Sequence, residues 1–166
     1  MVVLPVPGNP LKMMSICRAT FWHNLLAMRP MTNVKRIAGS SVTKRLQQSL
    51  VSAIDASPIL RVRAGTRSDH RFIGIWAVVV DGRVFARSWM HKAGGWYQTF
   101  LDDPFGTIQV GDRQVQVRAL RVRGTRIHDD IERAYANKYT TPASIKYVRG
   151  FRTKRRRETT LEFVRP

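Results

Sequence analysis

Six basic side chains between positions 149 and 157 form the densest set in this sequence that could bind a ligand. They are Arg149, Arg152, Lys154, Arg155, Arg156 and Arg157. Guanidinium and ammonium groups donate strong hydrogen bonds to phosphate oxygens, so the run suits a phosphate group or a polyanion. A solvated surface loop explains the run equally well, because charged segments are common on protein surfaces.

Other reactive residue types are sparse and show no catalytic spacing. The sequence lacks a nucleophile elbow, a P-loop, a dinucleotide-binding glycine motif and a carboxylate pair, which disfavours hydrolytic chemistry. His70, His91 and His128 do not have metal-ligand spacing. Only His91 is kept as a candidate acid, against the simpler interpretation of an exposed loop histidine. Cys17 is the single cysteine, so neither an internal disulfide nor a cysteine metal cluster can form.

A large positive charge distinguishes the composition. The 166 residues contain 29 Lys and Arg against 11 Asp and Glu, for a formal net charge of +18. This balance favours nucleic acid, an anionic membrane surface or a phosphate-bearing ligand as partner, without choosing among them. The hydrophobic share of 43% permits a packed core. No apolar run of about 18 residues is present, so we expect no transmembrane segment. The single cysteine fits a cytoplasmic protein, which is the location we expect.

The first 40 residues differ in character from the rest of the chain. Prolines at positions 5, 7, 10 and 30 interrupt any periodicity there. We interpret residues 1–40 as an N-terminal extension that is poorly ordered, and residues 41–166 as a single domain.

The elements that would position these residues follow from hydrophobic periodicity. After an N-cap at Ser41 or Thr43, apolar residues recur every four positions as far as Ile54, which predicts a helix that ends before Pro58. Alternation over 59–64 then predicts a half-buried strand.

The clearest single element is a β-hairpin. The apolar run 75–80 meets Asp81 and Gly82, a dipeptide favoured in type I′ turns, and the chain continues as an antiparallel strand over 83–89. Residues 90–104 are expected to form a loop.

The rest of the chain predicts one more hairpin, a helix and a closing strand. Segments 107–110 and 114–122 flank a Gly-Asp turn. A helix begins near Thr125 and is ended by Pro142, and residues 159–164 alternate as a strand. About six antiparallel strands with two helices predict a mainly β (α+β) protein, a small barrel or half-barrel with helices covering its ends.

Short motifs in a defined order give the chain a family resemblance. Residues 46–166 resemble the bacterial family known as domain of unknown function 2255. The motifs that carry this are Ile54-Asp55-Ala56, Leu60-Arg61-Val62, Ile75-Trp76-Ala77-Val78, Val84-Phe85-Ala86-Arg87-Ser88 and Gly95-Trp96-Tyr97. Trp96-Tyr97, Leu101, Pro104, Val110-Gly111, Val117-Arg118-Ala119, Tyr139 and residues 159–166 are similar to the deazaflavin-dependent nitroreductase and quinone reductase group. That group has the split β-barrel of the pyridoxamine-phosphate-oxidase-like flavoproteins, so the resemblance implies a small antiparallel split β-barrel with two or three flanking helices.

The resemblance also implies a cofactor site in the segment after the first hairpin. The residues it implies are Arg87, Ser88, Lys92, Gly94, Gly95, Trp96 and Tyr97. Glycines allow a phosphate to approach the backbone, the basic and hydroxyl side chains supply countercharge and a donor, and the aromatic rings stack on a flat tricyclic ring. The alternative is a flexible glycine loop that aromatic residues anchor to the barrel. Three residues, Trp89-Met90-His91, stand before Lys92 where the reductases have a shorter, glycine-richer step, so the phosphate contacts differ in detail.

The leading hypothesis is therefore an oxidoreductase that binds FMN or a deazaflavin coenzyme. The cofactor performs hydride transfer in such proteins, so few catalytic side chains are needed and none is assigned here. The resemblance further implies a homodimer with the cofactor at or near the interface. The alternative is a basic nucleic-acid-binding or polyanion-binding barrel, motivated by the charge of +18 and by the basic run 149–157 with Tyr147 and Phe151 among it. A third hypothesis is a family member that kept the barrel and lost the cofactor.

Overall fold

The computed structural model describes residues 45–67 and 70–166. The helices are α1 (Gln48–Ala56), α2 (Trp96–Asp102), α3 (Thr125–Lys138), α4 (Pro142–Phe151) and α5 (Lys154–Arg157). The strands are β1 (Leu60–Ala64), β2 (Ile73–Ile75), β3 (Ala77–Val80), β4 (Arg83–Arg87), β5 (Phe105–Val110), β6 (Arg113–Arg121) and β7 (Thr160–Val164). The N-terminal extension predicted at 1–40 and the predicted helix caps Ser41 and Thr43 lie outside the described residues.

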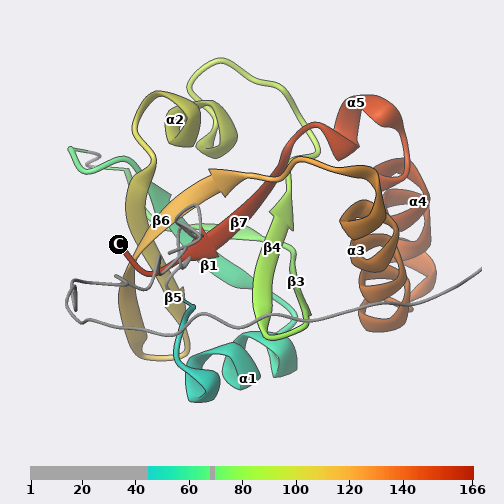
Figure 1. Cartoon of the computed structure of the whole chain (residues 1–166), viewed down its shortest axis with the longest axis horizontal. Coiled ribbons are helices and arrows are strands. Elements are labelled where there is room, and N and C mark those ends of the chain that lie inside the picture. Colours follow the sequence, from blue (N-terminus) through green and yellow to red (C-terminus); the bar gives the residue numbers. More distant parts are fainter. Residues whose placement is uncertain (1–44, 68–69) are drawn as a thin grey trace, which may run out of the picture. The chain divides into compact units, whose positions relative to one another are not determined.

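A single antiparallel sheet forms the centre of the fold (Figure 1). Its strand order is β2-β1-β5-β6-β7-β4-β3, so the two edge strands are consecutive in the sequence. Only Trp76 separates β2 from β3. The segment 73–80 therefore pairs first with β1 and then with β4, and this brings the two edges of the sheet together into a nearly closed barrel.

The prediction of one continuous strand over 75–80 is wrong for this reason. Ile75 ends β2 and Ala77 begins β3, and each half pairs with a different neighbour. An apolar run in the sequence predicts that its residues are buried, but it does not predict which neighbouring strand each half of the run pairs with.

The two hairpins are confirmed. β3 and β4 meet with Val80 opposite Arg83, and the turn residues Asp81 and Gly82 have φ values of 51° and 71°, as a type I′ turn requires. β4 ends at Arg87, two residues before the predicted end at 89. In the second hairpin β5 and β6 meet through a turn in which Gly111 has a φ of 55°.

Two helices cover the ends of the barrel, as Figure 1 shows. α1 buries Leu50, Val51 and Ile54 against the barrel interior, which confirms the predicted apolar stripe, although the helix begins only at Gln48. At the other end α2 buries Phe100 in the same core.

α2 lies where the sequence predicted only a loop. The helix begins directly after Gly95 and has only seven residues. Seven residues are too few to show a helical period in the sequence. Phe100 packs so closely on β5 that a Cβ at Gly106 would lie 2.7 Å from its ring and 2.6 Å from the carbonyl oxygen of Arg63. Because Gly106 has no side chain, α2 can pack directly against this end of the barrel.

A second core forms outside the barrel wall. The outward-facing residues of β3 and β4, among them Val78 and Phe85, pack against Ile131 and Tyr135 of α3 and Phe151 of α4. The prediction that Pro142 ends the first of these helices is wrong. α3 ends at Lys138, and Pro142 occupies the first turn of α4, where its missing N–H costs nothing.

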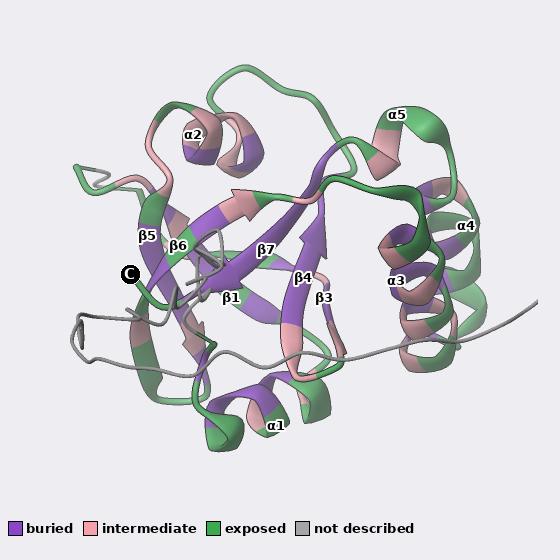
Figure 2. Cartoon of the chain, viewed as in Figure 1, coloured by how far each residue is buried: buried purple, intermediate pink, exposed green. Residues whose placement is uncertain are grey.

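The closing strand β7 is confirmed but is buried on both faces (Figure 2). All five of its residues are buried, because β7 lies between β6 and β4 and its outer face is covered as well. The predicted mainly β (α+β) antiparallel barrel of split-barrel type is confirmed, with five helices described in place of two or three. In the described part of the chain, no helix is both long and apolar enough to cross a lipid bilayer.

Gly106→Ala tests the close approach of α2 to the barrel. We expect a loss of about 1–3 kcal/mol in the free energy of unfolding, because the added methyl group meets both a backbone oxygen and the Phe100 ring. Urea denaturation measures this, with the exposed residue Gln116 of neighbouring β6 changed to Ala as the control. Equal stability of the two variants would contradict the packing described.

Candidate functional site

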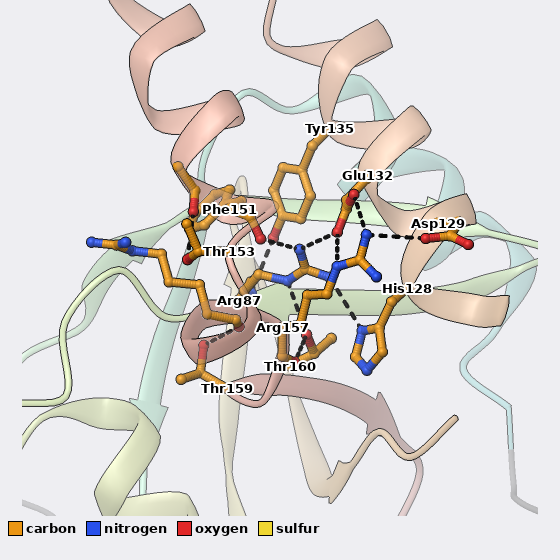
Figure 3. A network of polar contacts seen from close by, with 12 residues as sticks. Arg87, His128, Asp129, Glu132, Tyr135, Phe151, Thr153, Arg157, Thr159 and Thr160 are labelled. Carbon is orange, nitrogen blue, oxygen red and sulfur yellow. Dashed lines mark hydrogen bonds and ion pairs between the residues drawn. The ribbon is translucent and has the colours of Figure 1, made fainter. Parts of the chain in front are cut away.

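A buried arginine on the outer face of β4 organises the region beside the candidate site (Figure 3). The side chain of Arg87 has no exposed surface. Its Nε donates to Thr160 Oγ1 at 2.9 Å, and Nη1 donates to the carbonyl oxygen of Phe151 at 2.5 Å. Nη1 also lies 3.2 Å from Glu132 Oε1, and Nη2 lies 3.2 Å from His128 Nδ1. All three guanidinium nitrogens therefore have partners inside the protein.

Glu132 is held between two arginines. Arg87 approaches it from the barrel side, while Arg157 Nε lies 2.6 Å from Oε1 and Arg157 Nη2 donates to Oε2 at 2.8 Å. Arg157 also contacts Asp129 at 3.1 Å. Burial lowers the pKa of Arg87, and the contacts of Glu132 oppose that effect by favouring the charged form. The pairing therefore compensates for a cation inside the protein.

Tyr135 of α3 and Tyr139, which follows the last residue of α3, hydrogen-bond to the backbone near the break between β2 and β3. The Tyr135 hydroxyl accepts from the Arg87 N–H at 3.0 Å and donates to the Trp76 carbonyl oxygen at 3.2 Å. The Tyr139 hydroxyl accepts from the Ala77 N–H at 3.1 Å and lies 3.0 Å from the carbonyl oxygen of Pro58. Burial raises the pKa of both hydroxyls, that of Tyr139 to about 12, so both act as neutral hydrogen-bonding groups.

The same tyrosines fix an indole ring in place. Trp76 stacks on Tyr139 with ring centroids 4.2 Å apart and an interplanar angle of 9°. Trp76 is one wall of a cleft of about 360 Å³, here called the aromatic cleft. The cleft is lined by Ile59, Gly74, Ile75, Trp76, Arg87, Trp89, Trp96, Tyr147 and Phe151.

Trp89 forms another wall of the aromatic cleft and is held from two sides. A Cβ at Gly150 of α4 would lie 2.5 Å from its ring, so the indole packs directly on the helix backbone. The Arg156 guanidinium lies 3.7 Å from the Trp89 ring centroid, and its Nε donates to the Trp89 carbonyl oxygen at 3.2 Å.

A second, more polar hollow of about 220 Å³ adjoins the N-terminal end of α2 and is here called the glycine hollow. It is lined by Val62, Arg63, Ala64, His70, Arg71, Ile73, Gly94, Gly95, Trp96 and Thr99. Trp96 lines both this hollow and the aromatic cleft. Gly94 has a φ of 70°, and no atom lies within 4 Å of where its Cβ would stand, so a ligand could approach the backbone there.

The structure brings together only some of the residues that the resemblance implied. Gly94, Gly95 and Trp96 lie at the hollows, whereas Lys92 is exposed on the adjoining loop and lines neither of them. Arg87 lines the aromatic cleft, but its guanidinium nitrogens face inward partners.

Ser88 and Tyr97 are buried in supporting positions. The Ser88 hydroxyl donates to the Met90 carbonyl oxygen at 2.8 Å, and the Tyr97 hydroxyl donates to the Glu158 carbonyl oxygen at 3.1 Å. The candidate acid His91 is exposed, and its ring centroid lies 5.3 Å from that of Tyr97. It lines neither the aromatic cleft nor the glycine hollow.

Sequence reasoning missed several walls of these hollows. Trp89 reaches the aromatic cleft from the segment after β4, Tyr147 and Phe151 reach it from α4, and Arg71 reaches the glycine hollow. The signal available in the sequence was the gathering of aromatic residues near 89–97 and 147–151, but their common cleft depends on how α4 packs against the barrel.

The basic run 149–157 does not form the loop that its charges suggested. Arg149 belongs to α4, and residues 154–157 form α5. Arg156 packs on Trp89, and Arg157 pairs with Glu132, so two of the six cations are engaged in internal contacts. This division weakens the case for an extended polyanion-binding surface.

The family model described as "Uncharacterized protein conserved in bacteria (DUF2255)" matches residues 50–163. The chain belongs to this family. The description of the family names no activity, so a function for this DUF2255 protein is argued from the residues of its site. No curated protein matches the chain.

Solved structures similar to this DUF2255 protein share little of its sequence. A conserved hypothetical protein, Rv2991 from Mycobacterium tuberculosis, has 13% identity and a TM-score of 0.48, over 75% of this chain and 81% of that one. An F420-H2 dependent reductase has 17% identity and a TM-score of 0.46, over 64% of this chain and 93% of that one. A FAD-binding protein from Mesorhizobium loti has 13% identity and a TM-score of 0.43, over 74% of this chain and 91% of that one.

Glu132→Gln tests the buried pair. The substitution leaves the Arg87 charge buried without its anionic partner, so we expect the free energy of unfolding to fall by about 3–5 kcal/mol. Asp130→Asn on the same helix is the control, because its partner Arg133 is exposed and an exposed pair contributes about 1 kcal/mol or less. Urea denaturation of both variants decides. Equal, small losses would show that the Arg87–Glu132 pair does not support the fold.

His128 should titrate below its ordinary range. Burial and then the charges of Arg87 and Arg157 lower its pKa from 6.5, opposed by Glu132 and Asp129. Since the folded state then binds fewer protons than the unfolded state, His128 contributes stability that is fully present above pH 6.5 and is lost as the pH falls from there through the lowered pKa of the folded state. An NMR titration of the histidine ring signals gives the pKa directly. An apparent pKa above 6.5 for His128 would contradict the described surroundings.

Proposed function

We propose that this DUF2255 protein binds a flavin or deazaflavin coenzyme and acts as an oxidoreductase on a substrate still to be identified. The observation that supports the proposal is the pair of hollows on either side of Trp96, one aromatic and one lined by glycine and arginine. Such a pair matches a ligand with a flat ring at one end and a phosphate group at the other. The coenzyme supplies hydride transfer when bound, and the protein binds and orients it.

The aromatic cleft is suited to the ring end of such a coenzyme. Its volume of about 360 Å³ lies within the usual range for small-molecule sites. The rings of Trp76, Trp89 and Trp96 line it, and two of these are fixed by direct packing, on Tyr139 and on Gly150 respectively. Rigid indole rings provide a large stacking surface at little cost in conformational entropy.

The glycine hollow is suited to the phosphate end. Arg63 and Arg71 supply positive charge on its wall, and the backbone at Gly94 is open to a ligand. Lys92 lies on the exposed loop just before these glycines, and the proposal assigns its flexible side chain to the bound phosphate. In this proposal Ser88 and Tyr97 hold the loop in place through their hydrogen bonds to the Met90 and Glu158 carbonyl oxygens. Arg87 positions Phe151 in the cleft wall and takes no part in phosphate binding.

The proposal is tested on the full chain with FMN, a deazaflavin coenzyme and heparin as a polyanion control, at physiological salt. A ligand of the folded state raises the melting temperature, and a stacked flavin changes its absorbance spectrum. We expect one coenzyme to stabilise the protein well beyond heparin. Stabilisation by heparin alone, or by none of the three, would overturn the proposal.

Two variants and a control locate the site. Trp96→Ala should abolish coenzyme binding, and Lys92→Ala should weaken it by about tenfold through loss of a charge-assisted hydrogen bond. Arg155→Ala removes one positive charge from an exposed position that lines neither hollow, and it should leave coenzyme binding unchanged. Equal weakening by Lys92→Ala and Arg155→Ala would contradict the assigned phosphate end. Light scattering on the same samples tests the homodimer that the resemblance implies.

A further inference from the structure

A basic cleft with a volume of about 670 Å³ lies at the N-terminal end of α3. Its walls come from the segment that follows β6, from the first turn of α3 and from the region of α5. Four exposed cations line it, Arg121, Arg123, Arg152 and Lys154. This basic cleft shares no lining residue with the aromatic cleft or the glycine hollow.

Most of the positive charge of the basic cleft has no acidic partner. Arg157 also lines the cleft, but its charge is paired with Glu132 and Asp129. Glu158 is the one acidic residue among the lining residues. Across residues 45–67 and 70–166, none of the four exposed cations forms an ion pair with a carboxylate. Like charges gathered around a concave surface raise the local concentration of anions.

The first turn of α3 adds hydrogen-bond donors to the same cleft. α3 has 14 residues, its N-cap is Gly124, and it has neither a side-chain cap nor an acidic residue in its first turn. The first N–H groups of a helix lack intrahelical partners and carry the positive end of the helix dipole. Gly124 and Thr125 both line the cleft, so the N-terminal end of α3, with its positive end of the helix dipole, adjoins it.

A buried histidine supplies a donor whose orientation is fixed from behind. His128 is about nine-tenths buried and lines the basic cleft. Its Nδ1 lies 3.2 Å from Arg87 Nη2, and because a guanidinium can only donate, Nδ1 must accept. Burial and the neighbouring arginines lower the pKa of His128, so the ring is neutral at neutral pH and carries its proton on Nε2. In Figure 3 this nitrogen lies on the side of the ring away from Arg87, and no described residue hydrogen-bonds to it.

We propose that the basic cleft binds a phosphate-bearing small molecule with at least two phosphate groups, whose oxygens accept from His128 Nε2–H and from the first turn of α3. Arg123, Arg152 and Lys154 neutralise its charge. The cleft is larger than a single phosphate needs, and four cations against one carboxylate favour a ligand with several negative charges. A bounded concave site with a buried donor fits a small molecule better than an extended nucleic-acid strand. The proposal is independent of the coenzyme site.

Binding of inorganic pyrophosphate to the full chain, measured by isothermal titration calorimetry at physiological ionic strength, tests the proposal. Arg152→Gln and Lys154→Gln should each weaken binding by about tenfold, because each removes a charge-assisted hydrogen bond. The matched control is Arg155→Gln, which removes the same charge from an exposed residue of α5 that does not line the cleft, and its binding should stay within about twofold of the original. Absence of binding, or equal weakening by the control, would overturn the proposal.

Histidine NMR spectra provide a readout that needs no variant. We expect the His128 ring to show the Nε2–H tautomer and its signal to shift when pyrophosphate is added. An Nδ1–H tautomer, or a His128 signal unmoved at saturating pyrophosphate, would overturn the proposal. A single-stranded oligonucleotide that binds more tightly than pyrophosphate and loses affinity equally in Arg152→Gln and Arg155→Gln would also overturn it, because the anion surface would then be extended.

Discussion

The ion pair between Arg87 and Glu132 is the constraint on which the arrangement of the hollows depends. The guanidinium of Arg87 takes its partners from three further elements, namely β7, α3 and the end of α4. An arginine without exposed surface is tolerated only when its donors are satisfied, so these elements must meet it in one relative position. The pair therefore fixes how α3 and α4 lie on the outer wall of the barrel.

The shapes of the aromatic cleft and of the basic cleft both depend on that arrangement of α3 and α4. On one side Arg87 holds the carbonyl oxygen of Phe151, and Phe151 with Tyr147 closes the aromatic cleft from α4. On the other side Arg87 sets the tautomer of His128 at the wall of the basic cleft. The break at Trp76 contributes in the same way. Tyr135 of α3 binds the Trp76 carbonyl oxygen, and Tyr139, just after α3, binds the Ala77 N–H and stacks on the indole that lines the cleft.

Features governed by local sequence were predictable, and those governed by distant partners were not. The type I′ turn at Asp81 and Gly82 and the alternating strand at 159–164 follow from neighbouring residues, and both are present. The change of partner strand at Trp76 could not be predicted, because its cause lies in β1 and β4 on opposite sides of the barrel. Pro142 alone predicts a helix end, but proline is also favoured in the first turn of a helix, where α4 has it.

The same limit applies to the site. The family resemblance implied Gly94, Gly95 and Trp96 as site residues, and these three line the glycine hollow. Arg87 carries the same charge as any surface arginine, and its burial depends on Glu132, which lies 45 positions away along the chain. The aromatic walls from α4 and the basic cleft at α3 likewise depend on tertiary packing, which composition does not reveal.

The most direct test of the central claim is an NMR titration of the full chain with the coenzyme that binds, following the indole N–H signals of assigned tryptophans. The account predicts that the signals of Trp76, Trp89 and Trp96 shift together through ring currents, with the His128 signal unchanged. Binding that leaves all three indole signals in place would show that the coenzyme ring lies elsewhere, and the proposed site would be wrong.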